Sequence, residues 1–232
     1  MPELPDTQYY LKIEDFNKAV GEDFIKYANR TLDKGYKFIV GLSHGHSPAS
    51  VYNYIFENYD RIHHPSNILY TFVNSPLIRQ QDLRQITDAR GFIRRLFRAG
   101  LITRRQIIGY DFNRDTIEEY TEAFNRSISY YMREYGKKGF DYVFLGCNPE
   151  GRVAAITRQS IAFDSTDSAM IVMDRKDKQV TATPSFLLKS RRIAFLATKA
   201  DKRRPLAWLY AVDVREDQSP GFLRFLPRCA NG

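Results

Sequence analysis

Short apolar runs alternate along this chain with longer segments of helical periodicity, and this alternation limits the possible folds more than any other feature. The run at residues 140–146 is nearly continuously apolar, which is typical of a strand buried on both faces. Shorter strand candidates lie at 37–42, 68–73, 106–110, 168–173, 179–183 and 192–198. Helical patterns cover 15–31, 48–59, 79–98, 116–135 and 201–211, with a short final helix near Gly221. This order predicts an α/β fold with three α/β/α layers, in which helices cover both faces of a mostly parallel, twisted sheet.

Composition favours one domain over residues 1–232, because repeats, low-complexity tracts and Pro-, Gly- or Ser-rich linkers are absent from the sequence. Cys147 and Cys229 do not make a disulfide framework, and no leader or membrane-spanning run is recognisable. We therefore expect a cytoplasmic protein without a membrane partner. The net charge of +8 is compatible with an anionic ligand, but a solvated basic surface explains most of it equally well.

Three loops follow predicted strands, at 43–48, 146–152 and 198–202, and we call them the first, second and third loop. In open α/β sheets, ligands bind beyond the carboxyl ends of the strands. The three loops should therefore lie together and form the binding site.

The first loop has the composition of a phosphate-binding turn. Ser43 and Ser47 offer hydroxyl groups, Gly45 allows the backbone to approach a ligand closely, and Pro48 suits the first turn of the following helix. His44 and His46 form a His-x-His pair, which can ligate a metal, but no Cys or carboxylate accompanies the pair at a recognised spacing. We expect no metal and no cofactor.

The first loop and later segments match, in order, the motifs of one enzyme family. Residues 41–52 read Gly-Leu-Ser-His-Gly-His-Ser-Pro-x-x-x-Tyr, and residues 140–154 read Phe-Asp-Tyr-Val-Phe-Leu-Gly-Cys-Asn-Pro-Glu-Gly-Arg-Val-Ala. Residues 180–187, 191–202 and 220–227 contain Val-Thr-Ala-Thr-Pro-x-x-Leu, Arg-Arg-Ile-Ala-Phe-Leu-Ala-Thr-Lys-Ala-Asp-Lys and Pro-Gly-Phe-Leu-Arg-Phe-Leu-Pro. Together they resemble the glucosamine-6-phosphate isomerase/6-phosphogluconolactonase family, and more closely its lactonase branch, whose fold has three α/β/α layers.

The resemblance implies that the phosphate-binding half of the family site is mostly kept. Ser43 and Gly45 match the positions that hold the phosphate, and Lys202 matches a lysine that reaches it. His44, His46 and Ser47 lie in the same loop and join the candidate phosphate-binding residues. An arginine of the family is replaced by Gln179, so Lys178 or Lys199 is a candidate to substitute for its charge.

The resemblance also implies that the catalytic half has changed. The histidine that is the expected general base is replaced by Arg152, which stays protonated and cannot accept a proton, although it can bind a carboxylate or a phosphate. An Asp-Glu-Arg set of the family is replaced by Asn74-Ser75-Pro76, of which Asn74 can still bind a sugar hydroxyl. Glu150 is either a replacement base or the ion-pair partner of Arg152.

The sequence therefore predicts a sugar-phosphate-binding protein of carbohydrate metabolism that resembles 6-phosphogluconolactonase, and that hydrolyses a sugar-phosphate lactone if it is active. Glu150, His46 and His44 are the candidate catalytic residues. The alternatives are an enzyme like glucosamine-6-phosphate deaminase/isomerase, or a catalytically silent sugar-phosphate sensor. A homo-oligomer is compatible with the sequence. Nucleic-acid binding is a weaker alternative than an exposed helix or a subunit contact, although arginines cluster at Arg94, Arg95, Arg98, Arg104 and Arg105.

Overall fold

The structure is a computed structural model that describes residues 7–76, 89–109, 116–157, 160–174, 177–199 and 202. Its main sheet contains four parallel strands in the order β2-β1-β4-β7. The strands are β1 (Phe38–Leu42), β2 (Ile68–Phe72), β4 (Tyr142–Gly146) and β7 (Ile193–Leu196). After β1 the chain moves to β2 on one side, whereas β4 lies on the other side. The boundary between β1 and β4 is thus a topological switch point, where such sheets bind ligands.

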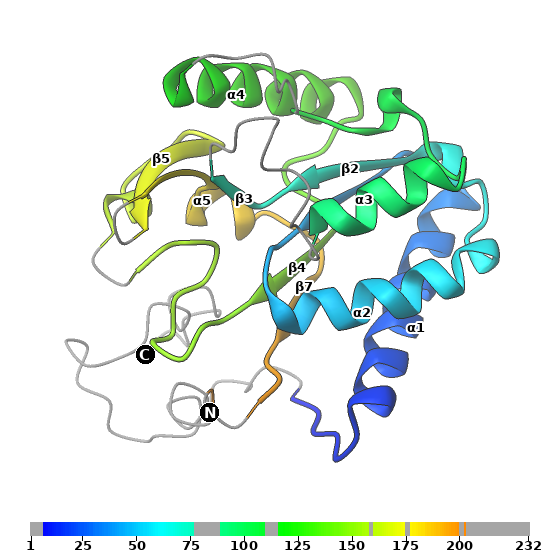
Figure 1. Ribbon diagram of the computed structural model, residues 1–232. Helices are drawn as coiled ribbons and strands as arrows, with labels where there is room; N and C mark the ends of the chain where they lie inside the picture. Colours follow the sequence, from blue (N-terminus) through cyan, green and yellow to red (C-terminus); the bar gives the residue numbers. More distant parts are fainter. Residues whose placement is uncertain are drawn as a thin grey trace, which may run out of the picture.

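Helices cover both faces of this sheet, as the sequence predicted (Figure 1). One face is covered by α1 (Ile13–Leu32), α2 (His46–Glu57) and α3 (Ala89–Arg98), and the other by α4 (Ile117–Glu134) and α5 (Pro184–Leu187). Short 3-10 turns lie at η1 (Tyr59–Arg61), η2 (Pro65–Asn67), η4 (Arg104–Gln106) and η5 (Ile161–Phe163). None of the described helices is both long and apolar enough to cross a bilayer.

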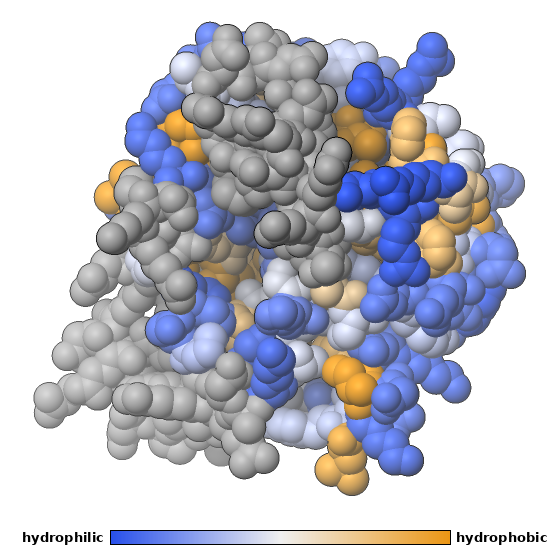
Figure 2. Space-filling model, in the orientation of Figure 1, coloured by the Kyte–Doolittle hydropathy of each residue, from blue (hydrophilic) through white to orange (hydrophobic). Residues whose placement is uncertain are grey.

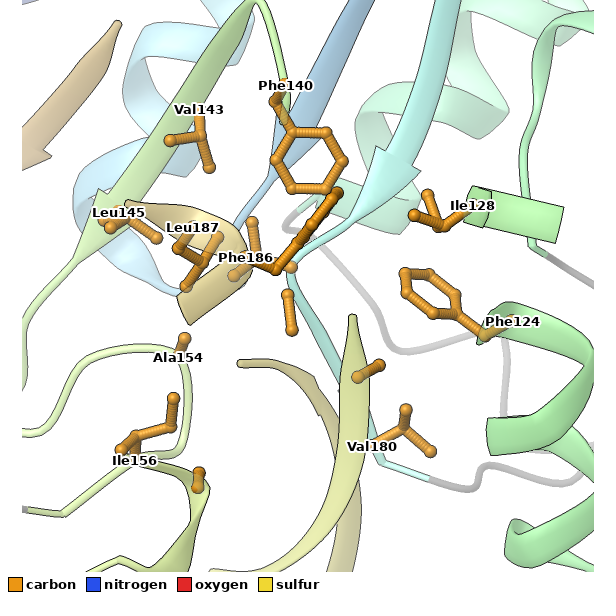
Figure 3. Close-up of a cluster of buried hydrophobic side chains, with 14 of the residues drawn as sticks. Phe124, Ile128, Phe140, Val143, Leu145, Ala154, Ile156, Val180, Phe186 and Leu187 are labelled. Carbon is orange, nitrogen blue, oxygen red and sulfur yellow. The ribbon is translucent and has the colours of Figure 1, made fainter. Parts of the chain in front are cut away.

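Alternation along the strands divides the core into two clusters, one on each face of the sheet. On β1, Phe38, Val40 and Leu42 pack with α1, α2 and α3, whereas Ile39 packs with α4 and α5. Figure 3 shows part of the second cluster, where Phe140 and Phe186 meet edge to face with ring centroids 4.9 Å apart. Both faces of β1 and β4 are buried, and this is why the two strands are almost continuously apolar.

A second, antiparallel sheet contains β3 (Asn74–Pro76), β6 (Asp177–Ala182) and β5 (Ala169–Asp174), in the order β3-β6-β5. The sequence predicted β5 and β6 as strands, but not their pairing with each other outside the main sheet. Val73 joins the two sheets, since its N–H donates to the carbonyl of Leu42 (2.9 Å) and its carbonyl accepts from the N–H of Ala182 (2.7 Å).

The predicted strand at 106–110 is wrong, because within residues 106–109 only a single bridge between Ile107 and Tyr70 forms. The preceding residue, Gln106, is buried at the end of η4, where its side-chain amide donates to the carbonyls of Pro65 (2.9 Å) and Ile68 (3.1 Å). These bonds hold the segment in a turn. Residues 79–88 and the helices predicted at 201–211 and near Gly221 lie outside the described residues, apart from residue 202.

A buried ion pair fixes β4 beside β1. Asp141 is fully buried and accepts hydrogen bonds from the N–H of Ile39 (2.8 Å) and from Lys137 Nζ, which lies 2.6 Å from its nearer oxygen. The Lys137 side chain is itself only 5% exposed. Arg191 also lies 3.6 Å from Asp141. Removing Asp141 would leave the Lys137 ammonium uncompensated in the core, so the pair secures the boundary at which the switch point lies.

Candidate functional site

The first and second loops meet at the switch point, as predicted from the sequence. Gly146, the last residue of β4, lies against the start of α2 so closely that an added Cβ would be 3.2 Å from Pro48 Cδ and 3.8 Å from the carbonyl oxygen of His44. A larger residue at this position would push the two loops apart. Glycine at the end of β4 therefore allows the carboxyl end of this strand to contact the N-terminus of α2.

The first loop presents backbone N–H groups at the start of α2. Gly45 precedes the helix with φ 120° and ψ 169°, a backbone conformation that is largely restricted to glycine. No side chain of a described residue caps this helix end. The first backbone bond of the helix runs from Ala49 N–H to the carbonyl of Gly45 (3.2 Å), so the N–H groups of His46 and Ser47 precede the intrahelical pattern. Such an N-terminus is suited to an anion.

Ser47 connects the first loop to the third loop. Its hydroxyl oxygen is buried and accepts from the N–H of Thr198 (3.0 Å) and from Lys202 Nζ (2.8 Å). Both acceptor positions of the hydroxyl are then used, so its own proton points to Thr198 Oγ1, 2.9 Å away. Lys202 is only 8% exposed, and the contact places its ammonium group at the positive end of α2.

Ser43 is buried at the end of β1, and Tyr52 fixes its backbone. The Tyr52 hydroxyl donates to the carbonyl of Ser43 (2.9 Å), while the tyrosine ring stacks on Phe92 of α3 with centroids 5.1 Å apart. The Ser43 hydroxyl contacts the carbonyl of His44 at 3.4 Å, a long hydrogen bond that a ligand could replace. Tyr52 matched the family motif in sequence, but its role in orienting the first loop had no signal beyond that match.

The two histidines of the first loop have different surroundings. His44 is half-buried, and its ring stacks on Phe72 at the carboxyl end of β2, with centroids 5.5 Å apart and planes within 4°. His46 is exposed in the first turn of α2. Since the two side chains occupy different positions, the loop does not present them as a pair. Among the described residues, no three His, Cys, Asp or Glu side chains gather at a possible metal site.

The second loop is a closed turn that fixes the backbone of Arg152. The N–H of Asn148 donates to the carbonyl of Arg152 (3.0 Å), and the Asn148 side-chain oxygen accepts from the N–H of Arg152 (2.8 Å). The Arg152 side chain is 18% exposed and lies 3.9 Å from Glu150 Oε2, whereas the Glu150 side chain is 63% exposed. Glu150 and Arg152 are therefore ion-pair partners, but the contact is longer than a hydrogen bond.

Asn74 lies on the second sheet, next to Gln179, the position where an arginine was expected from the sequence resemblance. It is half-buried, and its side-chain N–H donates to Gln179 Oε1 over 3.2 Å. Lys178 and Lys199 were the two candidates to supply a positive charge in place of an arginine. The Lys178 ammonium pairs with Glu118 of α4 at 3.0 Å, whereas Lys199 lies in the third loop, next to Thr198. Lys199 also has a φ of 82°, in the left-handed region that favours glycine.

The clustered arginines lie on two elements, with Arg94, Arg95 and Arg98 on α3 and Arg104 and Arg105 in η4. Hydrophilic residues gather over α3 in Figure 2. Arg95 packs against α2, with its guanidinium 4.0 Å from the centre of the Phe56 ring and a hydrogen bond to Asn53 Oδ1. This contact fixes α3 on α2, which is a structural role for one of the five arginines.

A model for the family described as glucosamine-6-phosphate isomerases/6-phosphogluconolactonase matches residues 12–222. The chain belongs to this family. The match spans all three loops and both sheets, so Asn74, Gln179 and Arg152 lie within the matched region. A comparison with curated proteins gives no match by sequence.

Solved structures of the family share the fold at low sequence identity. A 6-phosphogluconolactonase from Thermotoga maritima has 23% identity and a TM-score of 0.71, with 85% of this chain and 87% of that chain covered. A 6-phosphogluconolactonase from Leishmania guyanensis has 16% identity and a TM-score of 0.74, covering 96% and 92%. A monomeric glucosamine-6-phosphate deaminase has 14% identity and a TM-score of 0.69, covering 89% and 88%.

Proposed function

We propose that this chain binds a sugar phosphate at the switch point, as a 6-phosphogluconolactonase-like protein of carbohydrate metabolism. The observation that carries the proposal is the contact of Lys202 Nζ with the buried Ser47 hydroxyl at the start of α2. Family membership and the names of the solved relatives support a phosphorylated sugar as the ligand. The proposal includes one domain, a cytoplasmic location and a divergent active site.

Electrostatics favours an anion at this position. The N-terminus of α2 carries a partial positive charge, and a buried ammonium group beside it adds a full one. An anion placed near both positive features is stabilised by each of them. A phosphate group supplies that charge and accepts hydrogen bonds from Lys202 and from the N–H groups of His46 and Ser47.

Hydrolysis of a lactone also needs a group that activates water, and the described residues offer two exposed candidates. Glu150 is exposed beside Arg152, and His46 is exposed at the start of α2. His44 is a less suitable base, because its ring is stacked on Phe72. Deamination is disfavoured, because Asn74 donates to Gln179 in place of the family aspartate and cannot abstract a proton. Arg152 in the position of the family base favours binding without turnover as the second candidate function.

Thermal unfolding in the presence of ligand tests the binding proposal. At a concentration one hundred times its Kd, a ligand stabilises the folded state by about 2.7 kcal/mol. For a chain of this size that raises the Tm by roughly 5–10 °C. We expect this shift with glucosamine 6-phosphate or 6-phosphogluconate, no shift with glucose or gluconate, and loss of the shift in Lys202→Met. If no sugar phosphate at millimolar concentration moves the Tm of the wild-type chain, the proposal fails.

Turnover is measured separately, as hydrolysis of 6-phosphogluconolactone above the spontaneous rate. A rate excess that falls in Glu150→Gln or in His46→Ala would assign the base to that residue. A wild-type chain that binds sugar phosphates without any rate excess would be a binding protein and not a lactonase.

A further inference from the structure

The second loop and the turn that follows it, residues 153–156, have a strained backbone on both sides of Arg152. Gly151, Ala154 and Ala155 have φ values of 76°, 53° and 61°, and for the two alanines this left-handed conformation costs roughly 1 kcal/mol each. Paired hydrogen bonds between Val153 and Ile156 close the turn. Strain of this kind persists only where the surroundings enforce it, and it is concentrated at functional sites.

The surroundings that enforce this loop are visible on its buried side. The Thr181 hydroxyl of β6 donates to the carbonyl of Ala154 over 2.5 Å. Ala154 and Ile156 point into the same apolar core as Val180 and Leu187 (Figure 3). The loop is thus fixed to the second sheet by contacts that do not involve the side chain of Arg152. The backbone of residue 152 is therefore fixed, and its side chain is only 18% exposed.

The Arg152 guanidinium forms a long ion pair with the Glu150 carboxylate. Glu150 Oε2 lies 3.9 Å from it, beyond the 2.7–2.9 Å of a charge-assisted hydrogen bond, and the Glu150 side chain is 63% exposed. Because the contact is long and Glu150 is exposed, this ion pair contributes little to stability. The carboxylate of a ligand that enters the crevice can therefore replace Glu150 and form two parallel hydrogen bonds with the planar guanidinium.

We propose that Arg152 binds the carboxylate of a phosphorylated sugar acid whose phosphate group lies at the start of α2. This inference rests on the proposed function and narrows its ligand class. Lys202 and the N-terminus of α2 suit the phosphate end of such a ligand. The contact of Gly146 with Pro48 brings the second loop, which carries Arg152 for the acid end, beside the start of α2. A lactone or a sugar alcohol has no negative charge for Arg152, so the site favours the open-chain acid.

Binding measured by titration calorimetry tests the inference with three probes. The probe 6-phosphogluconate carries both anionic groups, sorbitol 6-phosphate carries only the phosphate, and gluconate carries only the carboxylate. The wild-type chain should bind the first roughly tenfold to a hundredfold more tightly than the second, and the third should bind more weakly than either. Arg152→Gln should remove this preference and leave the affinity for sorbitol 6-phosphate within about twofold.

Three further variants make the test specific. Arg152→Lys keeps the charge without the planar pair of donors, so it should retain only part of the preference for the acid. Glu150→Gln removes the competing carboxylate and should tighten 6-phosphogluconate binding by about twofold to fivefold. Lys202→Met should weaken both phosphorylated probes together. Arg152→Lys is also the variant to use if Arg152→Gln does not fold.

The two proposals fail in different ways. If the wild-type chain binds both phosphorylated probes equally, or if Arg152→Gln weakens both by the same factor, the role of Arg152 is refuted and sugar-phosphate binding stands. If neither phosphorylated probe binds the wild-type chain, the proposed function itself is refuted, and the inference with it.

Discussion

Replacing Ser47 by alanine tests how the first and third loops are held together. The hydroxyl is buried and is shared by the Thr198 N–H, the Thr198 hydroxyl and the Lys202 ammonium, at 3.0, 2.9 and 2.8 Å. Alanine removes all three contacts and adds no steric conflict, since it is smaller. The substitution therefore isolates the hydrogen bonds between α2 and the end of β7.

The magnitude follows from those three contacts. A neutral hydrogen bond contributes about 1 kcal/mol and one to a charged group about 1.5–3 kcal/mol. The Thr198 hydroxyl can rotate to another acceptor, so its loss costs less than the other two. Bonds that share one atom are not additive, so we expect Ser47→Ala to lower the free energy of unfolding by about 2–4 kcal/mol. For a chain of this length, that corresponds to a Tm lowered by roughly 5–12 °C.

Urea unfolding of the wild-type chain, Ser47→Ala and Ser50→Ala measures this difference. Ser50 is the matched control, because it is in the same helix and its hydroxyl makes one bond, to the carbonyl of Ser47 (3.1 Å). We expect the control to lose at most about 1 kcal/mol. If Ser47→Ala is no less stable than Ser50→Ala, Lys202 and Thr198 do not depend on the Ser47 hydroxyl, and the proposed arrangement of the third loop is wrong.

Three further predictions concern the backbone, the core and the surface. Gly45→Ala should lower the free energy of unfolding by about 1–3 kcal/mol and weaken phosphate binding, because φ is 120° at this residue. Gly100→Ala is the control, since Gly100 has φ 70° and open space around it, and this variant should leave phosphate binding unchanged. Asp141→Asn should cost about 3–5 kcal/mol in urea unfolding, and adding Lys137→Met should recover part of that loss. The Arg61 guanidinium lowers the pKa of Glu22 from 4.5 to about 2, so this pair stabilises the fold above pH 4.5 and its contribution is lost as the pH falls toward 2. Glu22→Gln should therefore flatten the acid limb of a plot of stability against pH, and an unchanged limb would contradict this.

Features set by local sequence were predictable, and those set by distant contacts were less so. The apolar runs at β1 and β4 and the helical period of α1 and α4 fixed these elements to within a few residues. The pairing of β6 with β3 was not apparent, because Asn74-Ser75-Pro76 has the composition of a turn. The segment around Gln106 has the apolar character of a strand, but its buried amide bonds make it a turn.

In the candidate site, too, the features set by local sequence were predictable and those set by distant contacts were not. The first loop was found from its own residues, because a glycine and two serines at the start of a helix have a direct physical reason to be there. Lys202 needed the family resemblance, since 155 positions separate it from Ser47 in the chain. Thr198 was quoted only as part of a motif, and no local pattern indicates that its backbone N–H binds the Ser47 hydroxyl. The difference between His44 and His46 depends on Phe72, which belongs to another strand.

Both halves of the proposed site are held mainly by backbone contacts, which do not depend on the side chains that would carry the chemistry. The phosphate half depends on the backbone: the conformation of Gly45, the N–H groups that begin α2, and the Thr198 N–H that holds Ser47. The second loop is likewise held through main-chain atoms of residue 152, so a histidine or an arginine fits there without a change of path. Solved relatives at 14–23% identity keep TM-scores of 0.69–0.74 for the same reason, since the backbone and the core set the fold. Under the proposed function, an arginine at 152 places a cation where a histidine would offer a proton acceptor, and this would suit the position to holding an acid.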